Sequence, residues 1–166
     1  MAILPILKFP DPRLRIKAQP IQEITQEIRQ IAEDMRETMY ANNGVGLAAT
    51  QVGINWRIFT MDVSEEHNQL YYIINPEIIT KESTQEDMEG CLSVGGGAYD
   101  RVSRARYVKM RGLDLEGKPI ELEGQDLMAA CIQHEIDHLD GILFIDHLSR
   151  LKQERIRKKI EKYTRR

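Results

Sequence analysis

The chain has 166 residues, of which 42% are hydrophobic and 30% charged, and its net charge at pH 7 is −3. This length predicts one domain, residues 1–166, with a buried core, and the composition is that of a soluble globular protein. No apolar run is long enough to cross a bilayer, and the first residues lack the order of a secretory signal peptide. We therefore expect a cytoplasmic protein without a membrane partner, in which Cys91 and Cys131 stay reduced.

The first third of the chain changes pattern twice. Prolines at positions 5, 10, 12 and 20 predict an extended arm with turns over residues 3–22. Apolar side chains then recur every three or four residues, which predicts an amphipathic helix with Thr25 as its N-cap and its end at residues 42–44 (NNG). In the following residues 44–53 (GVGLAATQVG), dense small side chains allow another chain to approach the backbone closely.

The middle of the chain is predicted to form strands. Residues 57–63 and 70–74 are rich in β-branched and aromatic side chains, and the Asn-Pro pair at 75–76 is expected to end the second strand before a third at 77–81. Residues 107–114 and 119–123 predict a hairpin that turns at residues 116–117. Because these strands do not alternate with crossover helices, an α+β fold is favoured over a parallel α/β sheet.

Residues 133–138 (QHEIDH) fall in a helix predicted from about residue 126 to 139. In a helix His134 and His138 are one turn apart, so both imidazoles leave the same face and can bind one metal ion. Glu135 projects beside that ion, where a carboxylate can take a proton from bound water. Two histidines leave room for a third protein ligand and a water, as in catalytic metal sites. A helix with two chance histidines is the alternative, but the chain has only four histidines.

The candidates for the third ligand are Cys91, Cys131, His67, His147 and the carboxylates. Cys131 lies seven residues before His138, about 10.5 Å along a helix axis, and its side chain is too short to share an ion with it. Cys131 is better explained as a small buried residue beside the site. Cys91 lies among glycines on a separate segment, so the residues favour it as a thiolate ligand, with a buried structural cysteine as the alternative. A Cys-His-His set suits Fe(II), Zn or Ni.

Three motifs in order give the chain a resemblance that covers essentially its whole length. Residues 44–51 (GVGLAATQ), 89–93 (EGCLS) and 133–138 (QHEIDH) together resemble the three motifs of the peptide deformylases. Residues 9–15 (FPDPRLR) and 148–153 (LSRLKQ) are similar to the bacterial branch with a long C-terminal helix. The resemblance implies an α+β fold in which antiparallel β-sheets pack around a central metal-binding helix, with a further helix near each terminus.

The resemblance also implies an activity. Members of this family are metallohydrolases that remove the formyl group from the N-terminal formylmethionine of nascent polypeptides and release formate. The positions that would bind the metal are Cys91, His134 and His138. The ion would be ferrous iron in the cell, with Zn²⁺, Ni²⁺ or Co²⁺ possible in purified protein. A metal-bound water would attack the formyl carbonyl with Glu135 as general acid/base, while Gln51 and the Leu92 backbone N–H would bind the carbonyl oxygen.

The expected substrate is an extended chain, which can bind by adding its backbone to a strand edge. Glycines would permit that approach, although a turn that caps the preceding helix is the simpler explanation for them. The substrate-binding residues expected on these grounds are Gly44, Val45, Gly46, Gly90, Leu127 and Cys131, the last two as a wall of the methionine pocket.

The chain departs from the family pattern at one place. Glycines occupy positions 95–97, where the family usually has a proline shortly after the EGCLS motif. The metal ligands are untouched by this change, so the expected activity stands. The change affects the outer substrate subsite, where we expect Tyr99 or Arg101 to contact the peptide beyond methionine.

The C-terminal tail is basic. Residues 150–166 hold nine lysines and arginines and two glutamates, a charge of +7, which leaves −10 on the remainder. A helix from about residue 149 would pack an apolar stripe on the body, formed by Leu148, Leu151, Ile156, Ile160 and Tyr163. A solvated basic face is the simplest interpretation, and ribosomal RNA is the partner that the resemblance suggests. Beyond nascent peptides and the ribosome we expect no DNA partner, and we expect a monomer.

Two other functions compete for the same residues. A zinc endopeptidase would use the same helix with a downstream third ligand, His147 or Glu154. A catalytically inactive RNA-binding subunit with a structural metal is the other alternative. Glu135 argues against the inactive subunit, because a closed structural site does not need that carboxylate.

Overall fold

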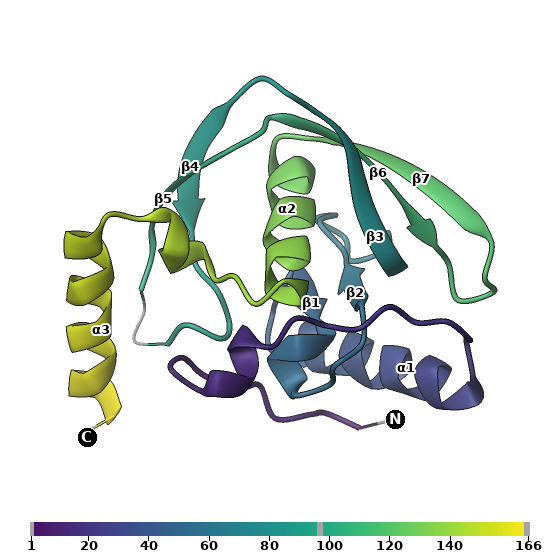
Figure 1. Ribbon diagram of the computed structural model, residues 1–166, viewed down its shortest axis with the longest axis horizontal. Coiled ribbons are helices and arrows are strands. Elements are labelled where there is room, and N and C mark those ends of the chain that lie inside the picture. The colour runs from purple at the N-terminus through teal and green to yellow at the C-terminus, as the bar shows by residue number, and fades with distance from the viewer. Residues whose placement is uncertain (1, 96–97, 165–166) are drawn as a thin grey trace.

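The computed structural model describes residues 2–95 and 98–164, which form an α+β fold (Figure 1). The strands are β1 (Gly46–Ala48), β2 (Ile58–Met61), β3 (Tyr71–Glu82), β4 (Gln85–Glu89), β5 (Asp100–Arg104), β6 (Tyr107–Leu113) and β7 (Pro119–Gln125). The α-helices are α1 (Gln26–Ala41), α2 (Leu127–Leu139) and α3 (Arg150–Thr164), and short 3₁₀ turns lie at η1 (Pro12–Arg15), η2 (Ala49–Val52) and η3 (Phe144–His147). In the described residues, β1, β2, β3, β6 and β7 form one antiparallel sheet in that order, and β4 pairs with β5. The expected fold class is confirmed.

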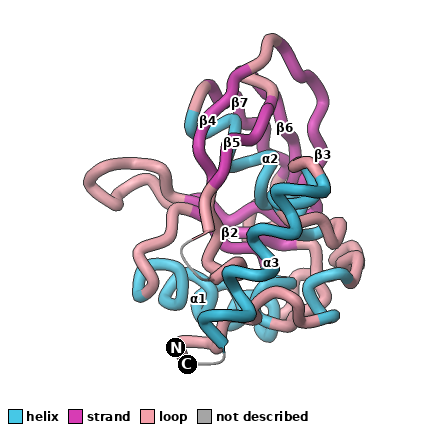
Figure 2. Tube along the Cα trace, turned by 90° about the vertical axis from the view of Figure 1, so that its left-hand side faces the viewer, coloured by secondary structure: helices cyan, strands magenta, loops and turns pink. Residues whose placement is uncertain are grey.

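Helix α2 lies in the middle of the molecule, with strands on several sides (Figures 1 and 2). It packs against β7, β1 and β2. Ala129, Ile132 and Leu139 are fully buried on it, in a core that includes Phe59 and Met110. Since apolar residues surround most of this helix, its few buried polar side chains stand in a water-poor interior, where they need specific partners.

Helix α1 follows the sequence prediction closely. The Thr25 hydroxyl accepts a hydrogen bond from the Ile28 N–H at 3.3 Å, which caps the first turn. The helix ends at Ala41, and Asn43 takes a left-handed conformation with φ 56°. Its buried face packs on Leu47 of β1 and Ile58 of β2. These contacts hold β1 against the helix that precedes it in the chain.

The prediction that the Asn-Pro pair separates two strands is wrong. Tyr71–Glu82 is one strand, and its register with β6 shifts between Ile74 and Glu77. Pro76 has no N–H for the ladder, and Asn75 has a φ of 52°, so a bulge takes up the residues that cannot pair. The hairpin of β6 and β7 is confirmed, with Gly117 at φ 79° in its turn. Strands β1, β4 and β5 were not predicted.

Helix α3 lies on the outside of the molecule, at the left edge in Figure 1, which is the side that faces the viewer in Figure 2. Ile156 and Ile160 are buried on it, as expected, in a cluster with Leu148 and Phe144. The placement of Leu151 in this stripe is wrong, since its side chain is 63% exposed. Five residues along a helix turn the side chain by about 140°, so Leu151 and Ile156 face opposite ways. The Tyr163 side chain lies outside the described part, and no helix within that part is long and apolar enough to span a membrane.

Candidate metal centre and active site

The structure brings Cys91, His134 and His138 together. The His138 Nε2 atom lies 3.2 Å from the Cys91 Sγ atom and 3.1 Å from the His134 Nε2 atom. The three ligand atoms all lie within 4.8 Å of one another. Tetrahedral ligands at about 2.0–2.3 Å from an ion are about 3.3–3.6 Å apart, so this spacing suits a single ion.

A carboxylate fixes the orientation of the first histidine. The Glu89 Oε1 atom lies 2.8 Å from the His134 Nδ1 atom, which turns Nε2 toward the other ligand atoms. Arg104 donates two hydrogen bonds to the same carboxylate, at 2.8 and 2.9 Å, and a third to Asp137 at 2.8 Å. Burial favours the neutral acid, but the hydrogen bonds from His134 and Arg104 outweigh it and lower the pKa of Glu89 to about 2.

The electrostatics of the cluster fit a bound cation. Burial lowers the pKa of His138 well below its usual range, which leaves a neutral imidazole that can bind a metal. The pKa of His134 is raised despite its burial, because hydrogen bonds to Cys91 and Glu89 favour its protonated form. A positive charge is thus favoured where Cys91 and the two imidazoles meet, which fits a site for a divalent ion.

Glu135 points from α2 toward β1. Its side chain is buried, and its Oε1 atom has no hydrogen-bond partner in the described structure. Burial raises the pKa of Glu135 to about 7. A Cβ atom at Gly46 would lie 2.4 Å from Glu135 Oε2 and 2.9 Å from Cys131 Sγ, so only glycine fits there. Gly46 therefore makes room for the Glu135 carboxylate. The sequence alone explains this glycine only by the approach of the substrate backbone or by a turn after the preceding helix.

Gln51 is held beside the cluster by its own turn. Its Oε1 atom accepts a hydrogen bond from the Ala48 N–H at 2.9 Å, and its Nε2 atom donates to the Ser93 hydroxyl at 3.1 Å. The same Nε2 atom lies 3.6 Å from Cys91 Sγ. The Thr50 hydroxyl donates to the His138 carbonyl at 2.9 Å, which joins η2 to the end of α2. The amide N–H group of Gln51 thus faces the proposed metal ligands from a fixed position.

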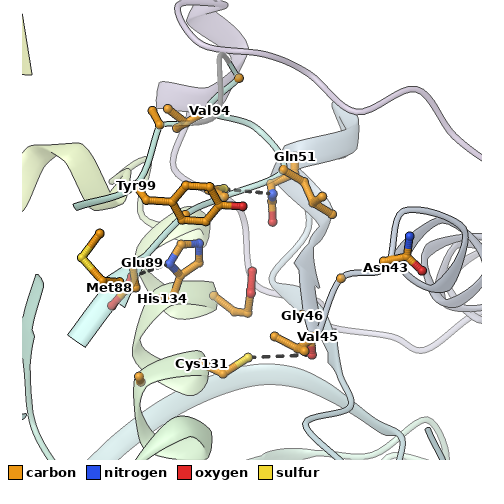
Figure 3. Close-up of a pocket in the computed structure, with 18 of the residues that line it drawn as sticks. Asn43, Val45, Gly46, Gln51, Met88, Glu89, Val94, Tyr99, Cys131 and His134 are labelled. Carbon is orange, nitrogen blue, oxygen red and sulfur yellow. Dashed lines mark hydrogen bonds and ion pairs between the residues drawn. The ribbon is translucent and has the colours of Figure 1, made fainter. Parts of the chain in front are cut away.

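A cavity of about 470 Å³ opens onto this cluster (Figure 3). The expected residues that line it are Gly44, Val45, Gly46, Gln51, Gly90, Cys91, Leu92, Leu127, Cys131, His134 and Glu135. Tyr99 also lines the cavity, whereas Arg101 does not. A Cβ atom at Gly90 would lie 2.2 Å from the Tyr99 ring, so the absent side chain lets the ring pack there. Of the three glycines after the EGCLS motif, positions 96 and 97 lie outside the described residues.

The other candidate ligands lie elsewhere. The His67 ring packs edge-on against Tyr40, and His147 Nε2 lies 2.8 Å from an Asp137 oxygen. Cys131 is buried, its Sγ atom lies 3.8 Å from the Val45 carbonyl, and burial raises its pKa. The geometry therefore matches the set with Cys91 and gives no support to the endopeptidase set with His147.

Comparison with known proteins gives the same picture. The profile of the family described as Polypeptide deformylase matches residues 3–154. The chain belongs to this family. It is similar to the peptide deformylase of Alkalilimnicola ehrlichii, with 54% identity over 166 residues, 99% of this chain and 93% of the relative. The peptide deformylase of Azotobacter vinelandii is 53% identical over 163 residues, which cover 98% of this chain and 96% of the relative.

Solved structures of peptide deformylases share the fold. The crystal structure from Legionella pneumophila has a TM-score of 0.95 at 45% identity, with 99% of this chain and 96% of that chain covered. The Ehrlichia chaffeensis enzyme in complex with actinonin also has a TM-score of 0.95, at 39% identity, with both chains covered completely. The chain thus has the peptide deformylase fold from end to end.

Sequence reasoning missed the residues that support this deformylase site. Glu89 stands in the EGCLS motif, and the rule that a metal-binding histidine donates its other nitrogen to a carboxylate could have indicated it. Ser93 ends the same motif, but neither its bond with Gln51 nor the contacts of Arg104 could be anticipated, because both depend on segments that are distant in the sequence.

Proposed function

We propose that this chain is a single-domain, metal-dependent peptide deformylase that hydrolyses the formamide of N-terminal formylmethionine and releases formate. The observation that carries the proposal is the convergence of Cys91, His134 and His138 beside the buried Glu135, at a cavity, in a member of this family. The reaction adds water across the formyl C–N bond. The carbonyl carbon leaves as formate and the nitrogen becomes the free amine of methionine.

The metal site would be formed by the Cys91 thiolate and the Nε2 atoms of His134 and His138. A bound divalent ion supplies Lewis acidity that polarises the formyl carbonyl and lowers the pKa of water. Thiolate and imidazole ligands suit Fe(II), Zn, Ni or Co by ligand type, and the family resemblance supports ferrous iron in the cell. Activity that is lost faster in air than under argon would support iron, and equal loss would contradict it.

Glu135 would act as general base and then as general acid. It takes a proton from the attacking water and delivers it to the leaving nitrogen, so no net proton stays on the enzyme. A pKa of about 7, caused mainly by burial, makes both protonation states accessible near neutral pH. The buried Oε1 atom has no partner in the described structure and can therefore accept that proton without first losing a hydrogen bond.

The oxygen of the formyl carbonyl gains negative charge as water attacks. Gln51 Nε2 and the Leu92 backbone N–H would donate to it, since both flank Cys91 at the cavity. Gln51 is 2% exposed and bonded at both ends of its amide, so little reorganisation is needed at the moment of reaction.

The rest of the cavity would hold the methionine side chain and the peptide backbone. Val45, Met88, Tyr99 and Leu127 are exposed apolar side chains, and all four line the cavity. An extended peptide beside β1 would cover them, and its backbone could pair with that strand. Tyr99 would contact the residue that follows methionine.

The direct test is the product formed from a formyl-Met-Ala-Ser peptide by anaerobically prepared protein. The proposal predicts formate together with an otherwise intact Met-Ala-Ser peptide, and near-complete loss of formate release in Glu135→Gln with the metal retained. Cleavage of an internal peptide bond would indicate an endopeptidase. No reaction by folded, metal-loaded protein would overturn the proposed activity.

The basic face of α3 would bind ribosomal RNA and place this cytoplasmic, monomeric enzyme near emerging chains. Arg155, Lys158 and Lys162 are exposed on α3, while Ile156 and Ile160 anchor the helix to the body. Replacing the three basic residues by glutamine keeps the anchor and removes three phosphate contacts. Ribosome affinity should fall, with a shallower dependence on salt, and peptide turnover should not change. Unchanged ribosome affinity at low salt would refute this role.

A further inference from the structure

Lys8, on the N-terminal arm, lies at the rim of the same cavity and touches the segment that carries Cys91. Its ammonium group donates a hydrogen bond to the Leu92 carbonyl oxygen. The arm is fixed on both sides of it, because the Leu7 N–H donates to the Gln51 carbonyl and the Phe9 N–H donates to the Ser93 carbonyl, each at 2.7 Å. The backbone at Lys8 is thus held at the loop by hydrogen bonds of its neighbours.

The peptide unit that Lys8 contacts also faces the proposed metal ligand. Its carbonyl belongs to Leu92 and its N–H to Ser93, and the Ser93 N–H donates to the Cys91 Sγ atom at 3.4 Å. A cation on the carbonyl oxygen draws electron density from the peptide and makes its N–H a stronger donor. Only one peptide unit therefore separates the ammonium from the sulfur.

We infer that Lys8 is a positioning residue that tunes the Cys91 thiolate through the Leu92–Ser93 peptide. A stronger N–H···S hydrogen bond withdraws electron density from the sulfur, so the thiolate gives less charge to a bound ion. The ion then stays a stronger Lewis acid toward the formyl carbonyl. This inference rests on the proposed metal site, and it adds a control on that site from the molecular surface.

The contacts of the N-terminal arm also restrain the residues that directly follow Cys91. The segment after Cys91 continues into glycines, which lose more conformational entropy than other residues on ordering. Contacts from the arm to Leu92 and Ser93 hold the part of this segment that lies next to the thiolate.

The test uses three variants of the full-length protein loaded with Co²⁺, whose thiolate ligand gives a sulfur-to-metal charge-transfer band. Lys8→Met removes the ammonium and keeps most of the stem, Lys8→Arg keeps the charge, and Lys17→Met removes another exposed lysine of the arm. We expect the band to move to longer wavelength in Lys8→Met, because a more electron-rich sulfur gives up an electron more easily. Lys8→Arg and Lys17→Met should keep the wild-type band.

Turnover gives the second readout. For formyl-Met-Ala-Ser, kcat should fall about threefold to tenfold in Lys8→Met with KM nearly unchanged, below the roughly 10–100-fold effect of a group that contacts a metal ligand directly. Lys8→Arg should have the wild-type kcat, because it keeps the positive charge.

Three results would overturn the inference in different ways. An unchanged band in Lys8→Met would refute it and leave the proposed function intact. A loss confined to formyl peptides with an acidic third residue, again with an unchanged band, would mean that Lys8 attracts the substrate instead. If wild-type protein lacked the thiolate band altogether, Cys91 would not bind the metal, and the proposed site itself would fail.

Discussion

Replacing Gly46 by alanine tests how closely the general acid/base is packed against β1. The new Cβ atom would lie 2.4 Å from Glu135 Oε2 and 2.9 Å from Cys131 Sγ, whereas ordinary contacts are 3.4 Å or longer. Restoring an ordinary contact requires the carboxylate to move by about 1 Å, because β1 is held between α1 and β2. Glu135 would then no longer point at the site of reaction.

A displacement of about 1 Å at a catalytic group typically costs about 10²-fold in rate, or about 2.7 kcal/mol of transition-state stabilisation. The extra methyl group in a filled interior should also destabilise the fold by about 1–3 kcal/mol. For a chain of this size each kcal/mol lowers the midpoint of thermal unfolding by about 2–4 °C. The variant should therefore be folded at 25 °C and nearly inactive.

Formate release and thermal unfolding, measured on the same samples, check this reasoning against a matched control. In Gly112→Ala the new Cβ atom would lie 2.9 Å from both Ile73 Cγ2 and the Ile74 carbonyl oxygen, away from the cavity. That variant should lose stability to a similar extent and keep the wild-type kcat within about twofold. Normal turnover in Gly46→Ala, or an equal loss of kcat in both variants, would refute the argument.

Further predictions concern the metal ligands and pH. Glu89→Gln should weaken metal binding about 10–100-fold in a chelator competition, whereas Glu121→Gln, an exposed carboxylate, should not change it. His147→Ala should keep one ion per chain, and loss of the ion would favour the endopeptidase ligand set. In metal-free protein, Glu135 has a folded-state pKa of about 7 against an ordinary 4.5, so its stabilising contribution is present below pH 4.5 and is lost as the pH rises through 7. Relative to Glu135→Gln, wild type should lose up to about 3 kcal/mol of unfolding free energy as the pH rises from below 4.5 to above 7. If urea unfolding gave the same free-energy difference between the two proteins at every pH, this prediction would be wrong.

Helix α1, the β6–β7 hairpin and helix α2 could be predicted from the sequence because their signals are local. Thr25 and Asn43 mark the ends of α1, and Gly117 supplies the left-handed turn of the hairpin. β3 could not be predicted as one strand, since the tolerance of Pro76 depends on a bulge that only its pairing with β6 defines. Strands β4 and β5 gave no signal because they carry many charged residues and, within the described part of the chain, pair only with each other.

The candidate site shows the same division between local and long-range information. One helical turn is enough to place His134 and His138 side by side, and the geometry of that turn excluded Cys131 as their partner. The approach of Cys91 to the two histidines follows from the packing of distant segments. The sequence could therefore only favour Cys91 as a ligand, first through the glycines around it and then through the motif resemblance. Lys8 could not be identified in advance, because an exposed lysine on an arm carries no signal until the arm is placed against the Leu92 carbonyl.

The proposed metal chemistry can be checked by the dependence of formate release on added Fe²⁺, measured without oxygen from metal-free protein. We expect a rate that rises linearly and stops rising at one ion per chain. Cys91→Ser under the same conditions should bind the ion weakly and stay inactive. Full activity in metal-free protein, or a Cys91→Ser variant that matches wild type at one ion per chain, would show that the proposed site does not carry the reaction.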